Sequence, residues 1–178
     1  MAAACKKVLM VIAPKNFRDE ELLETRKVLE GAGAKVTVAS STLSEVKGMF
    51  GAKARPDILL ESAKAAEYDA VIFVGGSGSA VYFDDQRAHA LAKATASAGK
   101  LLCAICIAPS ILAKAGLLKG KKATVWDDKG PAGPFSGNLK NGGALLSQDD
   151  VVRDGRIITA NGPPAASKFG RTIVEALG

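Results

Sequence analysis

Histidine is almost missing from this sequence of 178 residues, in which His89 is the single example. That residue lies within a predicted helix, away from the sheet edge where catalytic groups gather, so we interpret it as a surface or packing residue. A Cys-His catalytic pair within one chain, as in papain-like proteases, is therefore not expected. With one histidine and no second cysteine pair, we also predict no metal site and no cofactor.

Cysteine is scarce too, and its odd count of three argues against a disulfide scaffold. Cys103 and Cys106 have the spacing of a redox pair, but in a strand residues three apart point to opposite faces, so we expect no direct disulfide. The apolar run near the N-terminus, Val8 to Ala13, is too short for a signal peptide or a membrane span. These features predict a cytoplasmic protein with no membrane partner.

Aromatic residues make up only 5% of the chain, so Ala, Val, Leu and Ile must fill its core. The net charge is +6, but the basic residues are scattered and aromatic residues do not interleave with them. This pattern does not favour nucleic-acid binding, and we expect no nucleic-acid partner. The length and a hydrophobic content of 48% suit one domain, residues 1–178, with a sizeable core.

Strand and helix patterns alternate along most of the chain. Continuous apolar runs, or in 35–40 the alternation of Val36 and Val38, predict strands, and apolar stripes with clear end signals predict helices. The expected strands are 8–13, 35–40, 70–74 and 101–105, and the expected helices are 19–32, 84–97, 108–115 and 163–177. This alternation predicts an α/β fold, a three-layer sandwich whose mostly parallel central sheet has helices on both faces. Flavodoxin-like and Rossmann-like strand orders both stay open.

The remaining segments are shorter or richer in Gly and Pro. They are interpreted as a hairpin (45–47 with 58–60), a strand (123–126), a lid or binding loop (127–143) and a second hairpin (151–153 with 156–159). The lid is predicted from its many Gly and Pro residues. The second hairpin turns at Asp154-Gly155, and Asp84 is the expected N-cap of the helix over 84–97.

Cys106 stands where the predicted strand 101–105 gives way, within about two residues, to a predicted helix. A side chain on such a sharp turn is exposed above the sheet, as in the nucleophile elbows of hydrolases. The thiol would also face a helix N-terminus, whose partial positive charge favours the thiolate. Cys106 is therefore the expected nucleophile, and we expect its thiol to be open to water and more acidic than usual.

Two further strand ends carry groups that could act with this thiol, because the carboxyl ends of parallel strands share one edge of a sheet. Glu20 and Glu21 follow the first strand. A thiolate nearby would raise the pKa of such a carboxyl, which could then donate its proton to the sulfur. Gly75 and Gly76 follow the third strand, where their backbone N–H groups could approach a substrate oxygen, and the N–H of Ile107 would be a second donor.

Several segments match a known family pattern: 34–40 (AKVTVAS), 68–76 (YDAVIFVGG), 104–109 (AICIAP), 154–159 (DGRIIT), 161–163 (NGP) and 173–177 (IVEAL). Together they resemble the ThiJ/PfpI superfamily, also written DJ-one/PfpI, nearly end to end. The resemblance implies a flavodoxin-like sandwich, a homodimer or higher homo-oligomer, and Cys106 as the elbow nucleophile. It also implies that a glutamate of the first helix touches the sulfur, which is Glu21, or Glu20 if the register shifts.

Two positions depart from that family's pattern. Protease-like members carry histidine directly after the cysteine, where this chain has Ile107. Glyoxalase- and deglycase-like members often carry one on the following strand, where Trp126 stands. Proton transfer would then fall to Glu21, to water or to Asp127 and Asp128. Trp126 and the Gly/Pro-rich segment would shape the substrate pocket.

These observations favour an enzyme that acts on a small-molecule carbonyl such as methylglyoxal, or on its early adducts with amines, by glyoxalase or deglycase chemistry. Cys106 would attack, Glu21 would carry the proton, and the N–H groups of Gly76 and Ile107 would hold the oxyanion. A redox-responsive stress protein or chaperone, with Cys106 oxidised to sulfinic acid, is the main alternative. A PfpI-like peptidase or amidase, and a member with a substrate of its own, stay open as well.

Overall fold

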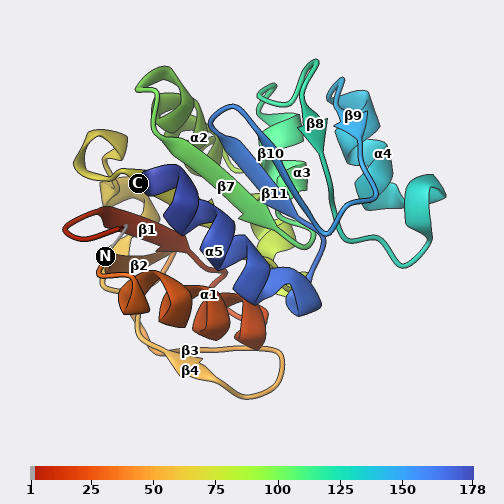
Figure 1. The fold of residues 1–178 in the computed structure, drawn as a ribbon. Helices are drawn as coiled ribbons and strands as arrows, with labels where there is room; N and C mark the ends of the chain where they lie inside the picture. The colour runs from red at the N-terminus through yellow and green to blue at the C-terminus, as the bar shows by residue number, and fades with distance from the viewer. Residues whose placement is uncertain (1–2) are drawn as a thin grey trace.

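The computed structural model describes residues 3–178, and its centre is a seven-stranded sheet with the order β10-β11-β7-β6-β1-β2-β5 (Figure 1). Neighbouring strands are parallel except for β10, which is antiparallel to β11. The strands are β1 (Lys7–Val11), β2 (Lys35–Ser40), β5 (Ile58–Leu59), β6 (Ala70–Phe73), β7 (Leu101–Ile105), β10 (Val151–Asp154) and β11 (Ile157–Ala160). Numbered along the chain, the longer parallel strands follow the order 2-1-3-4-5, which is flavodoxin-like and not Rossmann-like. The predicted fold class is confirmed.

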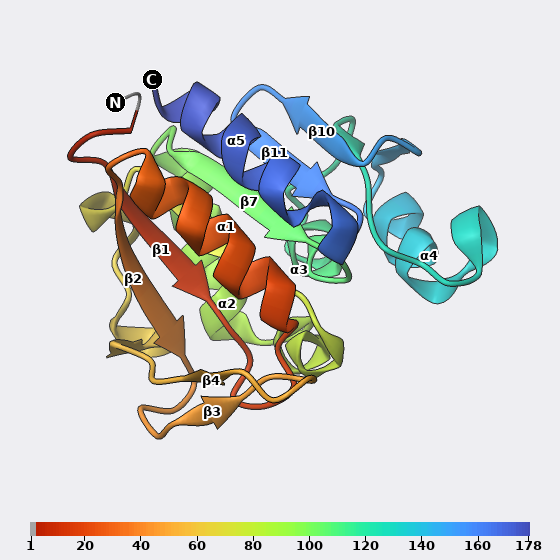
Figure 2. The same ribbon diagram turned by 60° about the horizontal axis from the view of Figure 1, so that its bottom comes forward.

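Helices cover both faces of this sheet. α1 (Asp19–Gly31) and α5 (Ala166–Leu177) lie side by side on one face, and α2 (Gln86–Ser97) and α3 (Pro109–Lys114) lie on the other (Figure 2). α4 (Pro134–Asn141) packs against α3 at the margin of the molecule. The three-layer arrangement expected from the sequence is therefore present.

Side-chain alternation explains why the central strands are apolar throughout. In β1, Val8 and Met10 belong to the core beneath α1 and α5, whereas Leu9 and Val11 belong to the core beneath α2 and α3. Successive side chains of a strand point to opposite faces, and here both faces are covered by helices. No position in β1 beyond its first residue can therefore be polar without burying that polar group.

The first predicted hairpin has a different partner strand. β3 (Val46–Lys47) pairs antiparallel with β4 (Lys53–Ala54), and the later Ile-Leu-Leu run joins the main sheet as β5, parallel to β2. The carboxylate of Asp19 accepts hydrogen bonds from the N–H groups of Phe50 (3.0 Å) and Ala52 (2.7 Å). These bonds fix the β3–β4 loop against the start of α1, so the chain turns back earlier than its apolar pattern indicates.

The segment 127–143 is not the loop that its composition predicts, because it contains α4. Pro134 takes the first helical position, where its missing N–H costs nothing. The Asp127 carboxylate accepts from the N–H of Ser136 at 2.8 Å and so satisfies a free donor of the first turn. Leu139, fully buried, packs this helix against the domain. The glycines of this segment therefore do not prevent a helix.

Several smaller expectations are also corrected or confirmed. The strand predicted at 123–126 is shorter, β8 (Lys122–Ala123), and it pairs parallel with β9 (Leu145–Leu146) in a small sheet of its own. The second hairpin is present as β10 and β11. Short 3-10 helices lie at Leu60–Ser62, Ala65–Glu67, Ser77–Tyr82, Gly130–Ala132 and Pro163–Ala165. No helix within residues 3–178 has both the length and the apolar character needed to cross a membrane.

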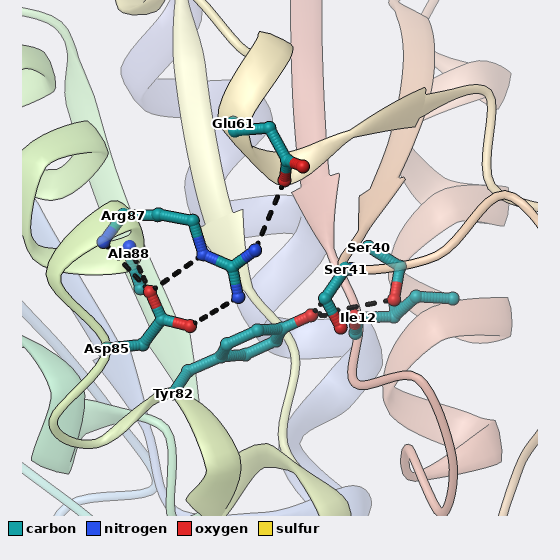
Figure 3. A network of polar contacts seen from close by, with 8 residues as sticks. All are labelled: Ile12, Ser40, Ser41, Glu61, Tyr82, Asp85, Arg87 and Ala88. Atoms are coloured by element: carbon teal, nitrogen blue, oxygen red, sulfur yellow. Dashed lines mark hydrogen bonds and ion pairs between the residues drawn. The ribbon is translucent and has the colours of Figure 1, made fainter.

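The N-cap of α2 is Asp85 and not the predicted Asp84, because the Asp85 carboxylate accepts from the N–H groups of Arg87 (2.8 Å) and Ala88 (3.4 Å). Its other oxygen pairs with the Arg87 guanidinium at 2.7 Å, and that guanidinium also reaches Glu61 at 3.3 Å (Figure 3). The cap is therefore part of a small surface network that holds the start of α2.

Tyr82 ties the ends of two central strands together (Figure 3). Its buried hydroxyl donates to the carbonyl of Ile12 (3.0 Å) and accepts from the N–H of Ser41 (3.1 Å). Ile12 directly follows β1 and Ser41 directly follows β2. The tyrosine therefore fixes the point from which the chain leaves β1 for α1, the helix that carries Glu20 and Glu21.

Candidate functional site

Cys106 occupies the turn between β7 and α3 in a left-handed backbone conformation, with φ of +65°. Such a conformation costs a non-glycine residue about 1–3 kcal/mol and persists only where the surroundings hold it. Two hydrogen bonds do so here. The N–H of Cys106 donates to the carbonyl of Ala160 (2.9 Å), and its carbonyl accepts from the N–H of Trp126 (2.8 Å). The sharp strand-to-helix turn predicted at this cysteine is therefore present and is fixed from two sides.

The Cys106 side chain is only 7% exposed, so the prediction of a freely exposed thiol is wrong. Neighbouring segments surround it, and it lines a cavity of about 600 Å³ together with Gly76, Ile107 and Trp126. Met49 and Trp126 line the same cavity, and the sulfur is reached through it.

Glu21, and not Glu20, is the carboxyl beside this sulfur. Its side chain comes from the first turn of α1 and is completely buried. One oxygen, Oε2, accepts from the N–H of Gly75 at 2.8 Å. The other, Oε1, has no hydrogen-bond partner among the described residues. The Glu21 carboxyl and the Cys106 thiol each shift the pKa of the other. The two groups are therefore close enough to exchange a proton.

Gly75 and Gly76 allow this close contact. A Cβ atom at Gly75 would overlap Cβ of Cys106 and would come within 2.5 Å of Oε2 of Glu21. Gly76 has φ of +97°, and a Cβ there would meet the backbone of the loop that precedes α1, including Arg18 N. Both glycines are therefore required by the packing of the thiol, the carboxyl and the loop into one space.

Burial raises the pKa of the Glu21 carboxyl to about 8, against the opposing effects of the Cys106 thiol and the Gly75 N–H. Burial also raises the pKa of the Cys106 thiol, and the Glu21 carboxylate raises it further. The N–H groups of Gly76 and Ile107 face the sulfur and act in the opposite direction. The prediction of a thiol more acidic than usual is therefore wrong. The two groups titrate as a coupled pair that carries at most one negative charge near neutral pH.

The rest of the cavity wall is mainly apolar, with one side contributed by the β3–β4 loop and the other by the segments around α4 and α5. Glu20, the alternative candidate for the carboxyl beside the thiol, lines this wall. The lining residues beyond those predicted are Arg18, Glu24, Met49, Ser77, Phe135, Pro163 and Pro164. Trp126 is 40% exposed, and its ring lies 6.2 Å from that of Phe135. Its predicted place in the pocket wall is observed. Phe135 was missed because it belongs to the segment interpreted as a lid loop.

Arg18 and Glu20 form an ion pair at the cavity wall. The Arg18 guanidinium donates to both oxygens of Glu20, at 2.8 and 3.2 Å, and lies 4.5 Å from the centre of the Phe50 ring. The pair lowers the pKa of Glu20, whereas Glu21, one residue further, is desolvated and has a raised pKa. This difference could not be inferred from the Glu-Glu sequence, because it depends on which side chain the helix turns inward.

Other candidates are set apart from the sulfur. Asp127 is engaged at the start of α4, and neither it nor Asp128 lines this cavity, so a proton-carrying role for them is disfavoured. His89 is buried in α2, and its Nε2 lies 2.7 Å from the carbonyl of Phe83, as expected of a packing residue. Cys103 is buried and unpaired with Cys106. In residues 3–178 no three His, Cys, Asp or Glu side chains gather as a metal site would require.

Comparison with known proteins gives one family. Residues 6–176 match the model of the DJ-1/PfpI family. The chain is 43% identical to the uncharacterized protein MJ0967 of Methanocaldococcus jannaschii, over 96% of this chain and 82% of that protein. It is 30% identical to the glutathione-independent glyoxalase DJR-1.2 of Caenorhabditis elegans, over 98% of this chain and 90% of that protein.

Two further similarities agree with this result. The chain is 28% identical to the deglycase TK1284 of Thermococcus kodakarensis, over 95% of this chain and 98% of that protein. The solved structure of a ThiJ/PfpI domain protein from Brachyspira murdochii superposes with a TM-score of 0.92 at 32% identity, covering 98% of this chain and 97% of that one. This chain and the Brachyspira murdochii protein therefore share one fold over nearly their full lengths.

Proposed function

Because the chain belongs to the DJ-1/PfpI family, we propose that it is a cysteine-dependent enzyme acting on small reactive carbonyl compounds, with glyoxalase or deglycase activity. The observation that carries this proposal is the contact between Cys106 and the buried, hard-to-ionise Glu21 at the wall of a cavity. Relatives named as a glyoxalase and a deglycase support the same chemistry. We further propose that the protein works in the reducing cytoplasm, where Cys106 stays a thiol.

The proposed reaction converts a 2-oxoaldehyde and water into a 2-hydroxy acid without an external oxidant. The Cys106 sulfur adds to the aldehyde carbon: a C–S bond forms, the C=O π bond breaks, and the oxygen receives a proton from Glu21. Glu21 then removes the C–H proton of this carbon and delivers it to the neighbouring ketone carbon, while the hydroxyl proton moves between the two oxygens. The aldehyde carbon is oxidised and the ketone carbon reduced. Water cleaves the resulting thioester, which releases the acid and restores the thiol.

The surrounding groups suit these steps. A carboxyl with a pKa of about 8 is divided between its acid and base forms near neutral pH, as a group that donates and then accepts a proton needs to be. The N–H groups of Gly76 and Ile107, which face the sulfur, also lie where they could donate to an oxyanion on the carbon attached to it. For an amine adduct, the C–S bond would form as the C–N bond breaks, and Glu21 would give its proton to the departing amine.

Methylglyoxal consumption by the wild type and by Cys106→Ser tests the proposal. We expect the loss of nearly all turnover in the variant, and equal rates would contradict it. Alkylation of the three cysteines against pH gives a second test, with exposed Cys5 and buried Cys103 as references within the same chain. Cys106 should react faster than Cys103 at every pH, because Cys106 lines the cavity and Cys103 is fully buried. Equal rates at Cys103 and Cys106 would count against a reactive sulfur.

The second candidate function is redox sensing by a stress protein or chaperone. It is favoured by Oε1 of Glu21, which lacks a partner among the described residues and could donate its proton to an oxidised Cys106. Conversion of the thiolate to the sulfinate consumes two molecules of peroxide, each reduced to water. Mass spectrometry after mild peroxide treatment should find two added oxygens on Cys106 before any on Cys5 or Cys103. Equal oxidation of Cys5 and Cys106 would contradict this function. The peptidase or amidase alternative has no histidine near Cys106 to support it.

We also propose that the protein is a homodimer or a higher homo-oligomer. α1 and the β3–β4 loop, which are joined by the hydrogen bonds of Asp19, carry the exposed apolar side chains of Leu23, Met49 and Phe50. A second copy covering them would remove this apolar surface from water. Sedimentation equilibrium should give at least twice the monomer mass for the wild type and a smaller mass for Phe50→Glu. A wild-type monomer at micromolar concentration would contradict the proposal.

A further inference from the structure

The cavity beside Cys106 is much larger than methylglyoxal. That molecule has five heavy atoms, and even at the ~30 Å³ that one water takes in the liquid these fill roughly 150 Å³. The cavity measures about 600 Å³. A small oxoaldehyde would leave most of this space to water, and cavities of this size ordinarily enclose ligands of several times as many atoms. The dimensions therefore indicate a reactive carbonyl attached to a larger carrier group.

The charge of the cavity differs in sign from that of the whole chain. The chain carries a net charge of +6, yet Arg18 is the single cationic side chain that lines this cavity, and both its bonds go to Glu20. Glu24, one helical turn after Glu20 on α1, also lines the cavity and forms no ion pair within the described residues. The cavity therefore presents one uncompensated carboxylate in addition to the Cys106–Glu21 pair.

Glu24 is oriented by its surroundings. Its Oε2 accepts a hydrogen bond of 2.9 Å from the hydroxyl of Ser167, at the start of α5. A carboxylate oxygen has more than one acceptor position, and Oε1 is left for a ligand. Trp126 and Phe135 supply aromatic surface to the same cavity. A carboxylate together with exposed aromatic faces is the combination that recognises an organic cation, by charge and by cation–π attraction.

We propose that Glu24 is a specificity-determining residue, and that the substrate is a reactive carbonyl whose carrier group bears a positive charge, such as an ammonium or guanidinium. This inference deepens the proposed function and depends on it for the attack by Cys106. The carbonyl lies at the sulfur, the carrier extends along the aromatic wall, and the cation pairs with Glu24. Neutral methylglyoxal alone would use only part of these contacts.

Binding can be tested without turnover, because Trp126 is the single tryptophan of the sequence and reports on the cavity by its fluorescence. Cys106→Ser is titrated with three inert probes of similar size: butylammonium, butanamide and butyrate. We expect butylammonium to bind about threefold to tenfold more tightly than butanamide, and butyrate to bind most weakly. Added salt should reduce the difference. Equal affinities, or tightest binding of butyrate, would overturn the inference.

Two charge-removing variants in the same Cys106→Ser background assign the effect to a residue. Glu24→Gln should abolish the preference for butylammonium over butanamide. Glu30→Gln, on the same helix but paired with Arg26 and outside the cavity, removes the same charge and should keep that preference. Loss of the preference in both variants would indicate that the total charge of α1 sets the preference, and it would contradict the role of Glu24.

Turnover provides the remaining comparison. Methylglyoxal forms hemithioacetals with thiocholine, mercaptoethanol and mercaptopropionate, which carry a positive, zero and negative charge. The quaternary ammonium of thiocholine cannot close onto the aldehyde carbon as a primary amine would. The inference predicts that kcat/KM decreases in that order and that Glu24→Gln removes the advantage of thiocholine. Turnover with no dependence on charge would overturn the inference and leave the proposed function intact. Selective binding of butylammonium with no turnover of any adduct would overturn the proposed function and leave the binding site intact.

Discussion

Replacing Glu21 by Gln should make the stability of this protein less dependent on pH. The Glu21 carboxyl is fully buried, and burial raises its pKa from the ordinary 4.5 to about 8. In the unfolded chain the same carboxyl loses its proton near pH 4.5. Between these two values the folded protein therefore holds a proton that the unfolded chain has already lost. The free energy of unfolding must fall as the pH rises through this range.

The size of the effect follows from the two pKa values. Each pH unit between them removes about 1.4 kcal/mol, so Glu21 lowers the free energy of unfolding by about 5 kcal/mol between pH 4.5 and pH 8. The full contribution of the neutral carboxyl is present below pH 4.5 and is lost once the pH passes 8. The slope does not depend on whether the last proton of the pair sits on oxygen or sulfur, because only the number of bound protons enters.

Glutamine is the suitable replacement, since its amide oxygen can still accept from the N–H of Gly75 while the group cannot ionise. Urea unfolding at 25 °C and at pH 5, 6, 7 and 8 measures the difference in unfolding free energy between Glu21→Gln and the wild type. We expect this difference to shift by several kcal/mol in favour of the variant from pH 5 to pH 8. Other titrating groups are common to both proteins and cancel in the difference.

Cys106→Ser is the control, because it removes the thiol but keeps the buried carboxyl. Burial is the main cause of the raised pKa of Glu21, so this variant should keep the wild-type dependence on pH. A difference between Glu21→Gln and the wild type that stays constant within about 0.5 kcal/mol over the whole range would refute the reasoning. It would mean that Glu21 ionises in the folded protein as it does in water.

Four other substitutions test the remaining contacts. Gly75→Ala should destabilise the protein by about 1–3 kcal/mol in urea unfolding and slow Cys106 alkylation, since its Cβ would overlap the thiol and carboxyl. Gly137→Ala, the control within α4, has open space around the new methyl group and should stabilise by about 0.5–1 kcal/mol. Asp127→Ala should cost about 1 kcal/mol through the loss of its bond to Ser136, with an unchanged alkylation rate; a slower rate would restore Asp127 as a proton carrier. Tyr82→Phe should cost about 1–3 kcal/mol, and an unchanged midpoint would show that its hydroxyl bonds add nothing.

The central sheet could be predicted because both of its faces are buried. The middle strands β6 and β7 are apolar and buried at every position, and β1 is so beyond its first residue. Such runs stand out in a sequence with few aromatic residues. The flanking helices were found from their end signals, including the acids that begin α1 and the glycines that follow it. Order within the sheet was left open, since strand patterns do not say which strands are neighbours.

The secondary-structure predictions are wrong where a contact between residues far apart in the sequence determines the local structure. The β3–β4 hairpin depends on Asp19, some thirty positions earlier, accepting from Phe50 and Ala52. α4 depends on Asp127, which reaches across nine positions to Ser136. In both cases a carboxylate outside the element satisfies its free N–H groups. Composition alone cannot reveal such a bond, and glycine content suggested a loop in the second case.

In the candidate site, too, the local structure could be predicted and the surroundings could not. The place of Cys106 could be predicted, because a change from strand to helix pattern is a local signal, and the φ of +65° agrees with it. The environment of its side chain could not be predicted. The neighbouring Glu20 and Glu21 have the same chemistry, yet Arg18 holds one ionised and solvated, and burial raises the pKa of the other.

The environment of Cys106 determines how its sulfur can react. A helix N-terminus acting on an exposed thiol would give a thiolate that is always present and open to water. The folded protein instead buries Cys106 beside a carboxyl that burial makes hard to ionise. Since the pair holds at most one charge, we propose that moving the last proton from the sulfur to the Glu21 carboxyl creates the nucleophile without moving any charge into water. Reactivity would then depend on the geometry that brings both groups together, and for that reason it would depend on Gly75, which has no chemistry of its own, as well as on the cysteine.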